Sequence, residues 1–290
     1  MDFTYGDTRF TTLDTGEFRL DGGAMFGHVP KTLWDTKIKA DADNCIPLGL
    51  RTLLVQGPNY KLLVDTGMGE KWDPALSMRF GLKVQSWDSL LGPLGLVTSD
   101  ITHVLITHLH FDHAGGLTCF DQDKKLKSVF ENAEVLVSQE NFRLAKSPVL
   151  REKASYRSEN WECLEKTGQL RMVSLGNSMG PKECVKGCWV IRSDGHTLGQ
   201  QLPFFETSHG IVAFCGDLIP TFHHSQLTWG MGYDSNPSLL ADEKQEFLQL
   251  AEAEKRILIL EHDSNTEAVV VEKEKDSAGR ERLVFRPESF

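Results

Sequence analysis

The chain has 290 residues, of which 40% are hydrophobic, 25% charged and 9% aromatic. This composition is that of an ordinary globular protein and excludes collagen-like, low-complexity and wholly disordered chains. With 31 basic against 41 acidic residues, the net charge is -10. A phosphate backbone would meet no overall positive field, so nucleic acid is not an expected partner.

The sequence shows no sign of a membrane or secretory segment. No apolar run approaches the roughly 18 residues needed to cross a bilayer, and the first ten residues lack the basic segment and apolar core of a signal peptide. The six cysteines have no CxxC spacing, which is typical of reduced thiols rather than of a disulfide framework. We therefore expect a cytoplasmic protein with no membrane partner.

The elements expected along the chain begin with an N-terminal arm or lid over residues 1–47, where glycine and aspartate are frequent and apolar positions are not periodic. A single domain follows over residues 48–290. Short apolar runs bounded by turn residues predict strands at 51–56, 61–65, 103–107, 134–138, 189–192, 211–215 and 257–261. The turn residues between the first two runs predict an antiparallel hairpin.

Helical periodicity interleaves with these strands at 138–145 and 241–255, and in the second segment Phe247, Leu250 and Ala251 share one face. The charged stretch 272–282 predicts a solvated hairpin loop. Because helices alternate with nearly continuous apolar strands, we predict an α/β sandwich of two facing sheets with helices on their outer sides.

The most informative segment is THLHFDHAGG at residues 107–116, directly after an apolar run. His108 and His110 alternate by two, so on an extended segment they project to the same side and could share one ion. Asp112 and His113 lie a turn further and are better placed to serve a second ion. These four donors predict a metal site, because each imidazole would otherwise need its own buried partner.

This segment resembles the HxHxDH signature of the metallo-β-lactamase-fold hydrolase superfamily. Further landmarks of that family follow in order: KLLVDTG at 61–67, DGHTLG at 194–199, FCGD at 214–217 and EHD at 261–263. The resemblance covers residues 51–263. It implies an α/β fold, a four-layer αββα sandwich, with the site at the edge where the two sheets meet.

The resemblance also implies two divalent metal ions. The residues holding the first would be His108, His110 and His196, and those holding the second Asp112, His113 and His262. Asp217 would bridge the two ions, and Asp65 would brace the site by hydrogen bonds. Zinc is the first expectation, with manganese, iron or cobalt as alternatives.

Such a centre favours hydrolysis. Divalent ions lower the pKa of bound water from about 15.7 to near 7, which supplies a metal-bridged hydroxide as nucleophile, and an ion facing the substrate polarises its carbonyl or phosphoryl oxygen. Asp112 is the expected catalytic residue, taking the proton as the hydroxide attacks and returning it to the leaving group.

The residues after Asp217 narrow the range of expected substrates. Segments 216–221 and 232–237, with a long helix before His262, resemble the branch that contains N-acyl-homoserine lactonases and methyl-parathion-type hydrolases. We therefore expect a hydrolase of small esters or lactones, similar to quorum-quenching lactonases, with promiscuity toward phosphotriesters. In one departure, Pro220 stands where those lactonases place a tyrosine that binds the substrate carbonyl.

Substrate-binding candidates come from two regions of the chain. They are Phe26, Phe222, His223, His224 and Tyr233. The two phenylalanines would line an apolar wall, and Tyr233 or one of the histidines would supply the donor missing at Pro220.

Three other functions stay open at this point. One is a mononuclear non-haem iron sulfur dioxygenase of the same fold, against which the complete dinuclear ligand set argues. The second is a glyoxalase-II-like thioesterase, which would carry a basic helical C-terminal part for glutathione. The third is a catalytically silent binding module. A homodimer through the N-terminal arm is a further expectation.

Overall fold

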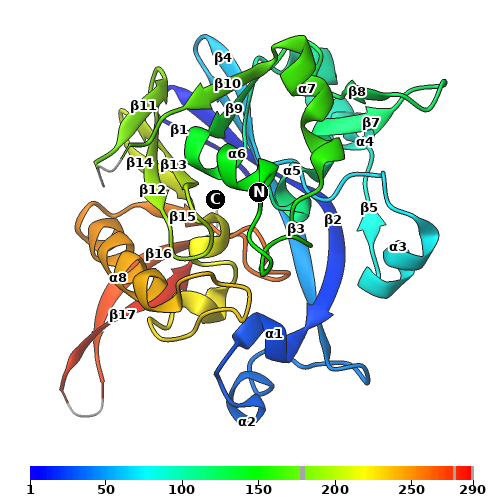
Figure 1. Cartoon of the computed structure of the whole chain (residues 1–290). Helices are drawn as coiled ribbons and strands as arrows, with labels where there is room; N and C mark the ends of the chain where they lie inside the picture. The colour runs from blue at the N-terminus through cyan, green and yellow to red at the C-terminus, as the bar shows by residue number, and fades with distance from the viewer. Residues whose placement is uncertain (177–179, 277–278, 289–290) are drawn as a thin grey trace.

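The computed structural model describes residues 1–176, 180–276 and 279–288. In this part of the chain two large sheets face each other, and a third sheet pairs only β7 (Thr118–Phe120) with β8 (Leu126–Ser128). Figure 1 shows the chain passing from the first large sheet, in blue to green, to the second, in yellow-green to red.

The first sheet has the strand order β1-β2-β3-β4-β6-β9-β10, and β5 pairs with β2. Its strands are β1 (Asp2–Tyr5), β2 (Thr8–Asp21), β3 (Cys45–Gly57), β4 (Tyr60–Val64), β5 (Lys83–Val84), β6 (His103–Leu105), β9 (Glu134–Ser138) and β10 (Leu170–Val173). The pairs β1–β2, β2–β3 and β3–β4 are antiparallel, whereas the pairs β4–β6, β6–β9 and β9–β10 are parallel.

The second sheet has the order β11-β12-β13-β14-β15-β16-β17. Its strands are β11 (Lys182–Val185), β12 (Cys188–Ser193), β13 (Gln200–Thr207), β14 (Gly210–Phe214), β15 (Ile257–Ile259), β16 (Ala268–Lys275) and β17 (Glu281–Pro287). Only the β14–β15 pair is parallel among the described strands of this sheet. The 17-residue helix α8 (Pro237–Ala253) makes that parallel connection.

Side chains that point alternately to the two faces of each strand build the layers of the sandwich. In β3, Leu53 and Val55 pack into the cluster between the two sheets, whereas Leu54 packs against the helices. In β14, Phe214 joins the cluster between the sheets and Ala213 lies under α8. Because successive strand residues point to opposite faces, each sheet buries both faces, and the four-layer αββα sandwich is confirmed.

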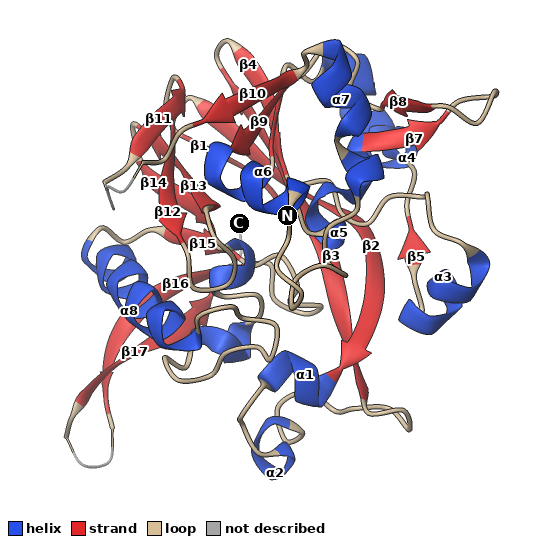
Figure 2. Ribbon diagram, viewed as in Figure 1, coloured by secondary structure: helices blue, strands red, loops and turns tan. Residues whose placement is uncertain are grey.

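Helices cover the outer face of each sheet, as Figure 2 shows in blue against the red strands. The outer face of the first sheet packs against residues of α4 (Trp87–Leu91), α5 (Phe111–Ala114), α6 (Gln139–Lys146) and α7 (Glu162–Thr167). Helix α8 covers the second sheet through Leu240, Phe247, Leu248 and Ala251. Both helices expected from periodicity are present, and Ser138 caps α6 by accepting a hydrogen bond from the Asn141 N–H.

The seven expected strands are all present, and the predicted hairpin at 56–60 is the antiparallel turn between β3 and β4. In the charged stretch 272–282, β16 continues to Lys275 and β17 begins at Glu281. Most of that stretch therefore belongs to paired strands rather than to a loop. Residues 277 and 278 of the expected loop lie outside the described residues.

Residues 1–47 differ from the expected arm. Strands β1 and β2 belong to the first sheet, and Phe10 is fully buried between the sheets. The segment after β2, with α1 (Gly22–Phe26) and α2 (Lys31–Trp34), forms a lobe beneath the sheets in Figure 1, and its own apolar cluster includes Phe26 and Trp34. The first half of the expected arm is therefore core, because β2 completes the sheet beside β3.

No helix in the described part of the chain combines the length and the apolar character that a bilayer span requires.

Candidate metal centre

Four of the expected donors come from one turn at the end of β6. The strand ends at Leu105, and α5 begins at Phe111 immediately after His110. The imidazoles of His108, His110 and His113 are buried. The Asp112 side chain keeps 13% of its surface exposed.

The other three donors follow strands of the second sheet. His196 lies in the loop after β12, Asp217 in the short helical turn Gly216–Leu218 after β14, and His262 three residues past the end of β15. The segments that follow β6, β12, β14 and β15 bring the seven side chains together in groups of three, and within each group the ligand atoms lie within 4.8 Å of one another.

Three imidazoles form the first group. The Nδ1 atom of His110 lies 3.0 Å from Nε2 of His108 and 3.2 Å from Nε2 of His196. All three imidazoles are buried. Their ring nitrogens therefore converge on one small volume, which is the geometry of a ligand set.

The second group joins Asp112, His113 and His262. The two Nε2 atoms of His113 and His262 are 3.3 Å apart. The Asp112 carboxylate lies 3.9 Å from the first of these nitrogens through Oδ1 and 4.0 Å from the second through Oδ2.

Asp217 stands between the two groups. Its Oδ2 atom lies 3.2 Å from Nε2 of His196 and 4.0 Å from Nε2 of His108. Its Oδ1 atom lies 3.2 Å from Nε2 of His262 and 3.5 Å from Nε2 of His113. One carboxylate oxygen thus faces each group.

The donor set fits divalent metal ions. Burial and the neighbouring imidazoles of His113, His110 and His196 hold the pKa of His108 well below its usual value, so this ring is neutral and keeps a free lone pair. Oδ1 of Asp217 is buried, and no residue that the structure describes donates a hydrogen bond to it. Imidazole nitrogens and carboxylate oxygens are the ligands that zinc, iron, cobalt and manganese accept.

Asp65 lies where a bracing role requires it. Its Oδ1 accepts a hydrogen bond from the Thr107 N–H at 2.7 Å, and its Oδ2 accepts one from the Thr107 hydroxyl at 2.6 Å and lies 3.0 Å from Nδ1 of His113. Asp65 takes a left-handed backbone conformation, with φ 59°. It therefore fixes the turn before His108 and the His113 ring together.

Sequence reasoning missed three buried carboxylates behind the histidines. Asp234 contacts Nδ1 of His196 at 2.9 Å, Glu152 lies 3.6 Å from Nε2 of His110, and Glu261 lies 3.0 Å from Nδ1 of His113. Burial raises the pKa of Glu261 to about 8. Glu261 adjoins His262 in the sequence and Asp234 adjoins Tyr233, but no spacing rule links either to its partner.

A cavity of about 730 Å³ opens beside the donors, which supply five of its lining residues: His110, Asp112, His196, Asp217 and His262. The rest of the wall is largely apolar and includes Phe18, Met25, Leu48, Trp72, Phe80 and Phe111. A concave, mostly apolar space with a few polar groups at one end is the form of a small-molecule site.

Of the five substrate-binding candidates, only Tyr233 lines this cavity. Phe26 is fully buried and stacks on the His224 ring, with centroids 4.7 Å apart, and Nε2 of His224 lies 2.9 Å from the Met25 carbonyl oxygen. These two rings pack behind Met25 instead of facing a substrate.

Phe222 and His223 line a separate cavity of about 160 Å³ on the other side of His262. The carbonyl of Pro220 accepts a hydrogen bond from the His262 N–H at 3.0 Å. The proline at the expected tyrosine position therefore holds the backbone of a metal-ligand candidate. Tyr233 is left as the aromatic hydroxyl that faces the donors' cavity.

Comparison with known proteins agrees with this arrangement. The family model of the metallo-beta-lactamase superfamily matches residues 50–145. A probable metallo-hydrolase of Mycobacterium tuberculosis is 29% identical over 199 residues, which are 62% of this chain and 58% of that protein. An N-acyl homoserine lactonase of Bacillus cereus is 24% identical over 239 residues, 77% of this chain and 85% of that protein. The chain thus spans less than two thirds of the mycobacterial relative.

Solved structures match over the whole chain. A probable metal-dependent hydrolase from Staphylococcus aureus superposes with a TM-score of 0.82 at 29% identity, covering 99% of this chain and 100% of that one. The dizinc quorum-quenching lactonase AidC superposes with a TM-score of 0.78 at 19% identity, covering 100% of this chain and 97% of that one. At this identity the likeness is one of fold alone. The chain therefore contains a metallo-beta-lactamase superfamily domain, with metallo-hydrolases and N-acyl homoserine lactonases among its homologues and structural neighbours.

Proposed function

We propose that this protein is a metal-dependent hydrolase of small esters or lactones that works with two divalent ions. The observation that carries the proposal is the carboxylate of Asp217, which turns one oxygen toward each of two groups of donors. A mononuclear iron oxygenase would need only the first group, so this pairing favours the dinuclear hydrolase. Zinc is the expected metal, with manganese, iron or cobalt as alternatives.

Each residue of the centre then has a defined role. His108, His110 and His196 hold one ion, and Asp112, His113 and His262 the other. When bound, the ions supply a hydroxide nucleophile at neutral pH and polarise the substrate's carbonyl. Asp112 is partly exposed and lines the cavity, so it can accept a proton there and return it to the leaving group.

Tyr233 is the best-placed group to orient the substrate. Burial, with Asp112 nearby, raises the pKa of Tyr233 to about 12. The hydroxyl is therefore protonated at neutral pH and can donate a hydrogen bond to the carbonyl or leaving oxygen of an ester. The apolar wall of the cavity suits an aliphatic or aromatic acyl group, which favours lactones and carboxylic esters over sugars or nucleotides.

The test begins with the metal content of protein purified without chelator or added metal, measured by elemental analysis. The same sample is then assayed against lactone, aryl ester, phosphotriester and thioester panels. We expect about two ions per chain, with turnover of lactones or esters. About one iron per chain without hydrolysis would refute the proposal, and thioester turnover alone would move the assignment to a thioesterase.

Two variants and a control sharpen this test. His108→Ala and Asp217→Ala should each lose metal and most of the activity, because each removes a donor that no neighbour replaces. His28→Ala removes an exposed histidine outside the cavity and should leave metal content and activity unchanged. Full activity in a metal-free Asp217→Ala protein would contradict the proposed role of the ions.

A further inference from the structure

Besides the metal-ligand candidates, three arginines line the cavity, although the protein as a whole is acidic. They are Arg19, Arg79 and Arg157. A positive group inside a largely apolar cavity is a specificity device, since it raises the local concentration of a ligand with opposite charge.

Two of these arginines are already neutralised by neighbours. Arg19 pairs with Asp41 at 2.6 Å. Arg157 pairs with Glu159 at 2.7 Å and lies over the Trp72 ring, 4.3 Å from its centroid. These side chains therefore build the wall and leave little free charge for a ligand.

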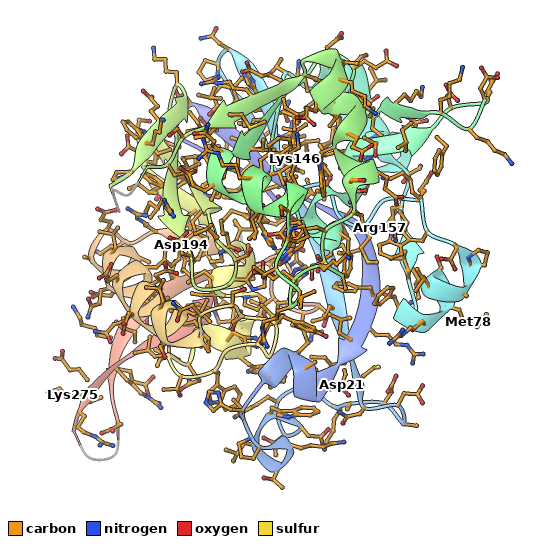
Figure 3. The ribbon with its side chains drawn as sticks, in the orientation of Figure 1. Asp21, Met78, Lys146, Arg157, Asp194 and Lys275 are labelled. Atoms are coloured by element: carbon orange, nitrogen blue, oxygen red, sulfur yellow. The ribbon has the colours of Figure 1, made fainter. Side chains whose placement is uncertain are left out.

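Arg79 differs, because no described residue pairs with it through an ion pair or a hydrogen bond. It lies on α3 (Pro74–Phe80), a short helix in which no residue is buried. Leu76, Arg79 and Phe80 all line the cavity, and their i, i+3, i+4 spacing puts them on one face of the helix. Met78, 77% exposed, lies off that face at the outer edge of the molecule (Figure 3).

Helix α3 is held against the metal-ligand segment by aromatic rings. Phe80 contacts Phe111, the residue next to Asp112, with centroids 5.7 Å apart, and it meets Trp72 edge-on at 5.4 Å. The helix face that carries Arg79 therefore keeps a fixed relation to the metal-ligand candidates.

Electrostatics places Arg79 within reach of the same group that faces those candidates. The charges of Asp112 and Asp21 favour the protonated form of Tyr233, and the charge of Arg79 opposes it. Tyr233 thus lies within electrostatic range of both Asp112 and Arg79, and all three line the same cavity.

We propose that Arg79 selects substrates whose apolar acyl chain ends in a carboxylate, binding that distal charge while the ester bond lies at the metal-ligand end. The inference rests on the proposed hydrolase function and names its substrate class. The apolar wall accepts the methylene chain, and the planar guanidinium matches a carboxylate in two-point contact. Because Arg79 is exposed to solvent, the preference should be modest and should weaken at high salt.

The test uses two esters that differ only at the far end. These are the p-nitrophenyl ester of hexanoic acid and the p-nitrophenyl monoester of adipic acid, both with six-carbon acyl chains. The measured quantity is the ratio of kcat/KM for the charged ester to that for the neutral one. We expect the wild-type protein to favour the charged ester roughly threefold to fivefold.

Substitutions at Arg79 should change that ratio in the order of their charge. Arg79→Lys should keep part of the preference, Arg79→Gln should abolish it through a higher KM for the charged ester, and Arg79→Glu should invert it. Arg143→Gln, on an exposed arginine of α6 outside the cavity, should leave the ratio as in wild type. An identical ratio in all Arg79 variants, or no preference in wild type, would overturn the inference.

A binding measurement separates this inference from the hydrolase proposal. Titration calorimetry of hexanoate and adipate into metal-loaded protein compares the same two chain ends without any turnover. Adipate should bind more tightly than hexanoate in wild type, and Arg79→Gln should remove the difference. If fully loaded protein hydrolyses neither these esters nor the lactones of the panel, the hydrolase proposal fails, and the calorimetric difference alone decides the role of Arg79.

Discussion

Nδ1 of His196 lies 2.9 Å from Oδ1 of Asp234, and both side chains are buried. The second oxygen of Asp234 accepts a hydrogen bond from the Met231 N–H at 2.6 Å. The carboxylate is thus fixed by its own loop and in turn fixes the imidazole, with Nε2 left to face Asp217. Carboxylates in this position orient the ring and raise its basicity as a ligand.

Replacing Asp234 should therefore weaken the binding of one of the two proposed metal ions. We expect Asp234→Ala to lower affinity for the ion beside His196 by about tenfold to a hundredfold, while the ion beside His262 stays bound. Competition with a chromogenic chelator would show this as one ion per chain released early. Asp242→Asn, on an exposed aspartate of α8, is the control. Simultaneous early release of both ions would contradict the assignment.

Glu152 should act on the same ion through His110. Its carboxylate is buried, accepts hydrogen bonds from the hydroxyls of Thr197 and Ser235, and lies 3.6 Å from Nε2 of His110. Glu152→Gln keeps the shape and removes the charge, so metal affinity should fall by about tenfold, with the far-ultraviolet spectrum unchanged. Glu246→Gln, on the exposed side of α8, should bind metal as wild type does. Unchanged chelator release from Glu152→Gln would exclude this role.

Phe26 should matter for stability instead of for substrate binding. The side chain is fully buried, stacked on Trp34 with centroids 5.4 Å apart and on His224 at 4.7 Å. Phe26→Ala should lower the free energy of unfolding by about 3–5 kcal/mol, since it leaves a cavity among rings that cannot collapse. Leu33→Ala, on the exposed part of the same lobe, is the control for urea unfolding. A raised KM at wild-type stability would restore Phe26 as a substrate contact.

Lys244 makes stability depend on pH. Its side chain is fully buried, with Nζ 2.7 Å from the Trp229 carbonyl oxygen, and burial lowers the pKa of Lys244 to about 8. The unfolded chain holds this proton up to about pH 10.4. Below pH 8 both states are charged and the folded state carries the full cost, about 3 kcal/mol. Between pH 8 and 10.4 the unfolded state binds more protons, so stability rises with pH.

Lys244→Met should remove that dependence. The variant should be more stable than wild type at pH 7, and its advantage should shrink as the pH rises from 8 to 10. The check is urea unfolding of both proteins at pH 7 and pH 9.5, with Lys186→Met as an exposed control. An advantage that is constant across this range would show that Lys244 does not titrate near pH 8.

The seven metal-ligand candidates carry a local signal in the sequence. Four lie within six residues, and the other three stand in short segments that resemble landmarks of the family. The buried carboxylates carry no such signal. Asp234 and Glu152 reach their histidines only after loops from separate parts of the chain fold against each other, and their spacing from His196 and His110 follows no rule.

The N-terminal segment shows a second limit of prediction from sequence patterns. In β2 the register shifts between Asp14 and Gly16, so the alternation of apolar side chains changes phase. Phe10 and Leu13, which are three positions apart before the shift, pack on opposite faces of the sheet, and Phe18, which follows it, joins the lobe's cluster. A strand with a bulge has no constant period of two, which is why this segment resembles an arm in the sequence.

The division of the metal-ligand candidates between the two sheets has a consequence for fragments of this chain. The part matched by the family model, residues 50–145, contains His108, His110, Asp112 and His113 but none of the candidates that follow strands of the second sheet. A truncated protein ending there would keep the recognisable signature yet hold three donors fewer, without the carboxylate that joins the two groups. A gene fragment or a split half with an intact signature would therefore be inert until its complement supplied the missing half of the ligand set.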